Sequence, residues 1–374
     1  MDFSVSEEEE AIRDLAHQIF SDGCAPEHIA EIERDESGDG FDHALYASLA
    51  ESHLLGVALP EKFEGSGYGL GALLVLLEEA GRAVAPLPLL PVLAQAAPAI
   101  QRFGTDGQRE QWLPGIAKGQ HILTVALDEL GSDDPAAPAT TARPDGDVWR
   151  LDGEKICVTA ASSAKRILVP ARTEEGGLGL FLVDPRAQGV ELEESRASDH
   201  GRQFRVVLRD VAVEADGILG DPQSGPEIVE SILNHTRIGV AALQIGVSEE
   251  ALRRTAEYTA TRKQFGRAIG TFQAVTMRSA DGYIDIESMR STLWQAAWRL
   301  ENDLSASQEA SAAAWWACEG AHRVVHTAQH LHGGMGADID YPIHRYFLRA
   351  TQLAMTVGGA GRQIATIGGN LAAQ

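Results

Sequence analysis

Two stretches in the last third of the chain combine residue types that could bind an anionic phosphate group. The first is "RKQFG", which begins at Arg262 and is followed by "TFQ" ending at Gln273; the second is "HLHGGMG", His330 to Gly336. A guanidinium donates good hydrogen bonds to a phosphate, and so do backbone N–H groups that glycine leaves accessible. Each motif alone also has a structural interpretation, because Arg-Lys on a helix is usually solvated and Gly-Gly after a helix usually forms a C-cap.

The segment that follows these motifs has no residue suited to general-base chemistry. The chain contains 54 Asp and Glu residues, yet none of them lies between Tyr341 and Gln374. Three nearby histidines, His330, His332 and His344, lack a carboxylate or cysteine partner at ligand spacing, so no metal site is predicted.

Helices are predicted on both sides of a β region. In residues 1–120, Ser6 and Glu9 form a capping-box signal before apolar residues at helical spacing, and "LPEKFEGSGYGLG" from Leu59 is typical of a loop. Residues 121–222 contain short runs rich in Val, Ile and Leu, which predict strands, and Asp152-Gly153 predicts a hairpin turn.

The helical period returns in residues 223–374. The stretch from "PEIVES" to "RKQFG" predicts one long helix or a close pair of helices. Within it, Glu249 and Glu250 precede Arg253 and Arg254 by four residues, which predicts a solvated helix face. Two tryptophan pairs in later helices, Trp294 with Trp298 and Trp315 with Trp316, are interpreted as packing residues rather than as a stacking platform.

Charge and composition exclude several classes of partner. The 374 residues carry a net charge of −23, which argues against nucleic acid and anionic membranes. Three widely spaced cysteines, Cys24, Cys157 and Cys318, match neither a disulfide framework nor a metal spacing, so we expect a reducing cytoplasm. The start "MDFSVSEEEE" does not resemble a signal peptide, and no apolar run is long enough to span a bilayer.

The order and spacing of the motifs together resemble the acyl-CoA dehydrogenase family over essentially the whole chain. The resemblance implies an α+β fold with an N-terminal helical domain (1–120), a middle β domain built as a small barrel or sandwich (121–222) and a C-terminal four-helix bundle (223–374). It also implies FAD and the oxidation of an acyl-CoA across its α,β carbons. In the family a base, nearly always Glu, removes the α proton while flavin N5 accepts the β hydride.

In this family the two motifs reach across a subunit interface to the FAD of a neighbouring subunit. The resemblance implies that Arg262, Gly333 and Gly334 bind the pyrophosphate of the FAD. It also implies that Phe265 and Gln273 line the same end of the cofactor. The family usually has Gln where this chain has His330, and the adjacent Gln329 leaves the assignment open between the two. The expected cofactor-binding residues are Arg262, Phe265, Gln273, His330, Gly333 and Gly334.

The resemblance ends at the catalytic base. One branch of the family places the Glu in a "YEGT"-like segment, which corresponds here to "TVGG" and puts Val357 at the Glu position. A second branch places it on the first long helix of the C-terminal domain, where this chain has Thr236. Valine cannot accept a proton, and a threonine hydroxyl is far too weak a base near neutral pH. No catalytic residue is therefore expected in this chain.

The segments that would hold the subunit's own flavin ring also depart from the family pattern. The family's "TEPxAGSD"-like loop corresponds to "LDELGSDDP", in which Glu129 and the triplet Gly131-Ser132-Asp133 still resemble it. Cys157 replaces the tryptophan expected beside the ring, while Thr159 is kept.

In the family, the motifs that this chain retains contact the FAD of a neighbouring subunit. The residues that it lacks would serve the flavin ring and substrate bound by the subunit itself. Some family members are α2β2 complexes of unlike subunits, associated with CoA thioesters of steroid side chains, and this chain resembles their non-catalytic subunit. The resemblance implies a partner subunit that carries the Glu, an acyl-CoA substrate and an electron-transfer flavoprotein or similar acceptor. Two alternatives remain open: a self-sufficient enzyme with a relocated base such as Asp338 or Asp340, and an acyl-CoA-binding scaffold without chemistry.

Overall fold

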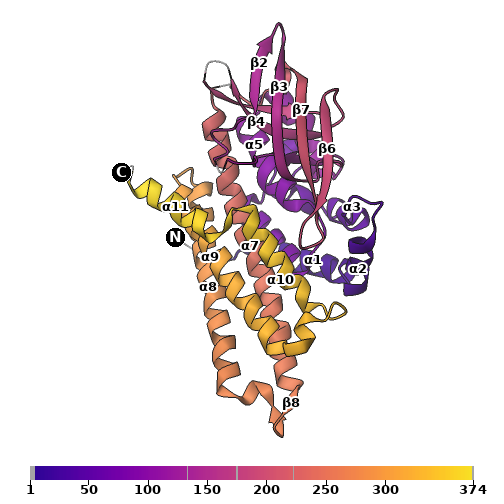
Figure 1. Cartoon of the computed structure of the whole chain (residues 1–374), viewed down its shortest axis with the longest axis vertical. Helices are drawn as coiled ribbons and strands as arrows, with labels where there is room; N and C mark the ends of the chain where they lie inside the picture. Colours follow the sequence, from indigo (N-terminus) through magenta and orange to yellow (C-terminus); the bar gives the residue numbers. More distant parts are fainter. Residues whose placement is uncertain (1–4, 133, 174–175, 222, 373–374) are drawn as a thin grey trace. The chain divides into compact units, whose positions relative to one another are not determined.

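The computed structural model describes residues 5–132, 134–173, 176–221 and 223–372 (Figure 1). Helices precede and follow a β sheet along the chain, so the α+β class and the predicted helical, β, helical order are confirmed. The chain divides into two compact units, one formed by Met1–Ala30, Leu70–Ala85 and Arg237–Gln374, the other by Glu31–Gly69 and Pro86–Thr236. The first unit is mainly helical, and the second contains the large sheet.

The N-terminal region is helical, as predicted. Its first helix, α1 (Glu7–Gly23), begins with the expected capping box, in which the Ser6 hydroxyl accepts from the Glu9 N–H and the Glu9 carboxylate accepts from the Ser6 N–H. The segment from Leu59 is a loop that includes one short 3₁₀ turn, Glu61–Phe63. The remaining helices are α2 (Pro26–Arg34), α3 (His43–Glu51), α4 (Gly69–Arg82), a π-helix at Leu90–Ala96, α5 (Ala97–Phe103) and α6 (Asp106–Ala117).

The middle region forms one seven-stranded sheet. The strands are β1 (Leu123–Val125), β2 (Thr141–Asp145), β3 (Val148–Thr159), β4 (Arg166–Thr173), β5 (Leu178–Val183), β6 (Val190–Arg196) and β7 (Arg202–Glu214). They pair in the order β1-β4-β2-β3-β7-β6, and β5 pairs with β4. Buried side chains such as Ile167, Phe181 and Val206 form the core of this unit.

The predicted hairpin turn at Asp152-Gly153 is wrong. Strand β3 continues through these residues, and the chain turns instead at Gly146-Asp147, between β2 and β3. At Gly153 the pairing of β3 with β7 shifts register, and a Cβ there would lie 2.5 Å from Thr140 Oγ1. The glycine is therefore needed for a close approach at a strand irregularity, which a sequence pattern cannot distinguish from a turn.

The C-terminal region contains, in its described residues 223–372, five α-helices, of which α7 to α10 run side by side as a bundle (Figure 1). The predicted long helix is a single helix that ends at Thr261, immediately before "RKQFG". The five are α7 (Gly225–Thr261), α8 (Gln273–Glu301), α9 (Ser307–His332), α10 (Ile343–Thr356) and α11 (Gly359–Ala372).

Helices α4 and α7 cross with their backbones in direct contact. A Cβ built on Gly81 would lie 2.1 Å from the Leu243 carbonyl oxygen, and one built on Gly246 would lie 1.8 Å from the Glu78 carbonyl oxygen. Real Cβ atoms do not come this close to backbone atoms, so each helix needs glycine at the crossing. The crossing fixes the position of α7 against α4.

We predict that Gly246→Ala destabilises the protein by about 1–3 kcal/mol, because the new methyl group has no room and must displace backbone. Gly368→Ala on α11 is the matched control, since a Cβ there meets nothing within 4 Å. Alanine is the better helix former, so the control should gain up to about 1 kcal/mol. Thermal unfolding of the two variants checks this, and equal effects would contradict the tight crossing.

Candidate functional site

The "RKQFG" motif forms a two-stranded hairpin that follows α7. Strands β8 (Lys263–Gln264) and β9 (Arg267–Ala268) pair antiparallel, and the Ile269 N–H donates to the Arg262 carbonyl at 2.8 Å. The turn residues Phe265 and Gly266 both have positive φ, 53° and 78°. Two central residues with positive φ define the turn that best matches the twist of a two-residue hairpin.

Phe265 lies at the tip of this hairpin in an unfavourable conformation. A positive φ is uncommon for a bulky residue, and backbone strain of this kind persists where the surrounding structure imposes it, often at functional sites. The side chain is 92% exposed and forms an edge-to-face pair with Phe272, with ring centroids 6.2 Å apart. Arg262 and Gln273 are exposed as well. All three side chains are thus free to contact a molecule outside this chain.

A buried histidine connects the hairpin to the second motif. His332, the last residue of α9, stacks on Tyr258 of α7 with ring centroids 4.4 Å apart, and Tyr258 lies one turn before Arg262. Its Nδ1–H donates to the Ala328 carbonyl at 2.8 Å, and its Nε2 lies 3.3 Å from the Tyr341 hydroxyl, which can donate to it. Burial lowers the pKa of His332, which favours the neutral ring that these contacts require. The structure therefore links the end of α7, which leads into the hairpin, to the end of α9, which leads into the glycine loop.

The glycine loop after His332 is open. Gly333 ends α9 with φ +60°, and a Cβ on Gly333 or Gly334 would meet no atom within 4 Å. His330 is exposed one turn before the loop. Gln329 is instead turned under it, with a buried Oε1 only 2.6 Å from the position of a Cβ on Gly336. Of the two residues left open by the sequence, His330 is the one with an exposed side chain.

The first base position, Thr236, is buried and fully hydrogen-bonded. Its hydroxyl donates to the Ile232 carbonyl at 2.7 Å and accepts from Gln95 Nε2 at 3.0 Å. Gln95 belongs to the π-helix at Leu90–Ala96, and π-helical turns occur often at functional sites. The hydroxyl proton is committed to a backbone carbonyl, so Thr236 can only maintain structure here.

At Val357, the other residue that the resemblance assigns to a base position, a buried glutamine binds the backbone. Val357 ends α10 with its side chain buried, and its carbonyl accepts from Gln363 Nε2 at 2.5 Å. The same amide accepts from Arg237 Nε through its Oε1 at 3.1 Å. Gln363 is only 1% exposed. It therefore joins α7, the end of α10 and α11 beside Val357, the residue that the resemblance assigns to one base position.

The loop "LDELGSDDP" is fixed by a buried ion pair. Lys155 is 0% exposed, and its Nζ lies 2.7 Å from Glu129 Oε1, which also accepts from the Thr140 hydroxyl at 2.6 Å. Burial raises the pKa of Glu129, but hydrogen bonds from Lys155 and Thr140 outweigh it and hold the pKa below its usual value. Asp133, part of the triplet noted in the sequence, lies outside the described residues.

Cys157 occupies an irregular part of β3. It is exposed, has φ +55°, and lies where the pairing with β7 shifts register between Lys155 and Val158. Thr159, the retained neighbour, accepts a hydrogen bond on its carbonyl from the Thr124 hydroxyl at 2.7 Å. Its backbone thus joins β3 to β1.

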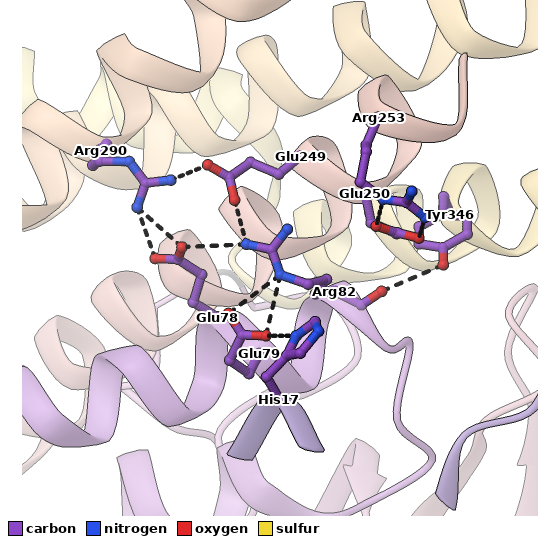
Figure 2. A network of polar contacts seen from close by, with 9 residues as sticks. All are labelled: His17, Glu78, Glu79, Arg82, Glu249, Glu250, Arg253, Arg290 and Tyr346. Carbon is purple, nitrogen blue, oxygen red and sulfur yellow. Dashed lines mark hydrogen bonds and ion pairs between the residues drawn. The ribbon is translucent and has the colours of Figure 1, made fainter. Parts of the chain in front are cut away.

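The predicted solvated face at Glu249 and Glu250 is wrong. Figure 2 shows Glu249 bound by Arg82 of α4 and Arg290 of α8. Glu250 is buried and accepts from Arg253 and Arg254 at 2.6–2.7 Å. The i,i+4 spacing identified one set of partners but not the other helices, which come from distant parts of the sequence.

The network extends to two adjacent buried glutamates on α4. Glu78 accepts from Arg290 at 2.9 and 3.0 Å, while Glu79 accepts from Arg82 and contacts His17 Nδ1 at 2.9 Å (Figure 2). Burial raises the pKa of Glu78, although Arg290 opposes the rise. A buried carboxylate of this kind can mark a functional site, but pairing with arginine makes a structural ion pair the better interpretation.

Tyr346 on α10 joins the same region. Its hydroxyl donates to the Arg82 carbonyl at 3.3 Å, and Arg254 lies over its ring at 5.5 Å. Burial raises the pKa of Tyr346 to about 12. This network and the roles of His332 and Gln363 were not predicted, because each depends on contacts between distant segments.

The described residues include neither a cluster of metal ligands nor a helix suited to a membrane. In that part of the chain no group of three or more His, Cys, Asp or Glu is placed to hold a metal ion. None of its helices is long and apolar enough to cross a membrane.

Known proteins match the chain over nearly its whole length. Family models described as the N-terminal, middle and C-terminal domains of acyl-CoA dehydrogenase match residues 6–120, 127–211 and 223–371. Acyl-CoA dehydrogenase FadE27 of Mycobacterium tuberculosis is 37% identical, over 100% of this chain and 99% of the relative.

Two solved structures match equally completely. A chain of the ChsE4-ChsE5 complex from Mycobacterium tuberculosis is 37% identical, with a TM-score of 0.94 and coverage of 100% of both chains. A chain of a variant of the Tcur3481-Tcur3483 steroid ACAD is 45% identical, with a TM-score of 0.91 and coverage of 99% of both chains.

We predict that Lys155→Met destabilises the protein by about 3–5 kcal/mol, because it leaves the Glu129 carboxylate buried without its cation. Lys155→Met combined with Glu129→Gln should recover much of that loss, since no uncompensated charge remains. Thermal and denaturant unfolding of both variants measure this. If the double variant is as unstable as the single one, the loss comes from packing rather than from charge.

Proposed function

Because the chain belongs to the acyl-CoA dehydrogenase family, we propose that it is the non-catalytic subunit of an FAD-dependent acyl-CoA dehydrogenase complex. Members of the family are FAD-dependent flavoproteins. In the proposed complex this chain helps to hold the FAD, and an unlike partner subunit supplies the catalytic Glu.

The observation that carries the proposal is the state of the two base positions. The Thr236 hydroxyl donates its proton to the Ile232 carbonyl, and Val357 is a buried apolar residue whose backbone carbonyl accepts from Gln363. General-base catalysis requires a group of suitable pKa within hydrogen-bond reach of the proton. Neither residue provides one. The acids Asp338 and Asp340 are exposed in the loop before α10, where Asp338 accepts a hydrogen bond from the Asp340 N–H.

The proposed FAD contacts are Arg262, Phe265, Gln273, His330, Gly333 and Gly334. The side chains among them are exposed, and the two glycines are open, so they fit a ligand held mainly by another subunit. A guanidinium and accessible glycine N–H groups each suit an anionic pyrophosphate. When bound, FAD supplies the acceptor for the hydride that leaves the substrate's β carbon.

The proposed reaction is α,β-dehydrogenation of an acyl-CoA, with a CoA thioester of a steroid side chain as the first substrate class to test. Support comes from the similar structures, one of a two-component complex and one of a steroid ACAD. Electrons would pass to an electron-transfer flavoprotein or a similar acceptor.

The proposal is tested by expressing the chain alone and together with a family subunit that carries Glu at either base position. Native mass spectrometry and flavin absorbance report composition and FAD content. We expect little FAD and no acyl-CoA oxidation from the chain alone, and a yellow, active hetero-oligomer from the pair. A yellow, active homo-oligomer would refute the proposal. A hetero-oligomer without flavin would favour the scaffold alternative.

We predict that Arg262→Ala weakens FAD binding by the complex about ten- to hundredfold, the effect of losing one charge-assisted contact with a phosphate. Arg278→Ala is the matched control, because Arg278 is also exposed but lies on α8, outside the proposed contacts. FAD titration of the two complexes measures the difference. Equal affinities would make Arg262 an ordinary surface charge.

A further inference from the structure

His332 and Tyr341 stand at the two ends of the glycine loop, residues 333–340, which connects α9 with the start of α10. The Tyr341 hydroxyl lies 3.3 Å from His332 Nε2 and donates to it, so a side-chain contact joins the two ends. A loop whose ends are held together has fewer conformations to lose when it is ordered against a ligand. This one contact therefore restricts the whole glycine loop.

Both end residues are themselves fixed to helices. His332 is 2% exposed, and its Nδ1–H donates to the Ala328 carbonyl one turn earlier on α9. A neutral imidazole has one donor and one acceptor, and both are used here. The Tyr341 carbonyl accepts from His344 Nδ1 on α10 at 2.8 Å, and the Tyr341 N–H donates to the Asp338 carbonyl at 3.2 Å. The base of the glycine loop is thus anchored to α9 on one side and to α10 on the other.

The same histidine also relates the loop to the end of α7. Its ring stacks on Tyr258 with the two ring planes 22° apart. The Tyr258 carbonyl in turn accepts from the Arg262 N–H at 2.8 Å, and Arg262 directly precedes the hairpin. His332 therefore contacts the residue that holds the Arg262 backbone, and it is bonded directly to Gly333. No other residue described above touches both of these segments.

We propose that His332 is a positioning residue for FAD: it closes the glycine loop against Tyr341 and fixes that loop to the end of α7. This rests on the proposed function, because the ligand is the FAD described there. Backbone N–H groups bind an anion well only when they are held in the direction of that anion. The buried His332 acts through Gly333 and Tyr258, whereas the exposed His330 is the histidine proposed to touch the cofactor.

The role is tested with His332→Phe and Tyr341→Phe in the complex with the Glu-carrying subunit. His332→Phe keeps an aromatic ring for the stack on Tyr258 but loses both hydrogen bonds, and Tyr341→Phe removes a single hydroxyl. By FAD titration, we expect Tyr341→Phe to weaken FAD binding about two- to tenfold, the effect of one hydrogen bond, and His332→Phe to weaken it at least as much. Acyl-CoA oxidation at saturating FAD should equal that of the wild type, because neither residue is proposed to touch the reacting atoms.

Tyr346→Phe is the matched control for the loss of a tyrosine hydroxyl. Its hydroxyl also donates across 3.3 Å, to the Arg82 carbonyl, but Tyr346 lies on α10 outside the glycine loop, so FAD affinity should not change. The double variant His332→Phe/Tyr341→Phe should bind FAD no more weakly than His332→Phe, because the hydroxyl then has no partner to lose. Additive losses, or an equal loss in the control, would overturn the positioning role.

Amide hydrogen exchange of the chain alone reports on the glycine loop without FAD or a partner. We expect faster exchange in residues 333–341 of His332→Phe and Tyr341→Phe, with unchanged exchange in α8. Faster exchange combined with wild-type FAD affinity would make the contact merely structural, so only this inference would be wrong. If the wild-type complex holds no FAD at all, the proposed function fails and the inference fails with it.

Discussion

The crossing of α4 and α7 is the contact on which the helical unit depends. Gly81 and Gly246 let the two backbones touch, so no side chain separates the helices. The charged groups beside the crossing are then held close together, and the buried carboxylates Glu78 and Glu79 would be costly there without a cation. Glu78, Arg82 and Glu249 satisfy one another there and bring in Arg290 from α8 (Figure 2). The crossing thus fixes three helices at once.

Helix α7 carries this fixed geometry to the functional residues. On one side of the crossing Arg237 meets Gln363, and on the other Tyr258 stacks on His332 next to the glycine loop. The exposed hairpin and loop are therefore supported by buried contacts on a rigid helix. The two base positions show the opposite arrangement, since both are buried and engaged in structural contacts.

The sequence predicted the elements well, because helix and strand periods are local properties. The capping box at Ser6 and the helical period through Gly225–Thr261 needed only neighbouring residues, although the choice between one helix and a close pair stayed open. Errors arose where a long-range contact decided the outcome. Asp152-Gly153 has the composition of a turn, but the glycine is needed there because Thr140 packs closely against it. Glu249 has the spacing of a solvated helix face, but it binds arginines of α4 and α8.

In the candidate site, too, the sequence revealed the local motifs but not the contacts between distant residues. Arg262 and Gly333-Gly334 were recognisable from their motifs, and the acid-free tail showed that Val357 had no substitute nearby. The stack of Tyr258 on His332 and the bridge made by Gln363 join residues more than 70 positions apart, so no local pattern could reveal them.

The strained turn at Phe265 has a consequence for the thermodynamics of association. A flexible loop loses conformational entropy when it is ordered against a ligand, and that loss is subtracted from affinity. Here the two-residue turn, the paired strands and the Phe272 contact already restrict the backbone before any partner arrives. The free-energy cost of the unfavourable φ is met when the chain folds, so the backbone that carries the Phe265 ring is already ordered before association. Association at the tip of this hairpin then loses little further conformational entropy of the backbone.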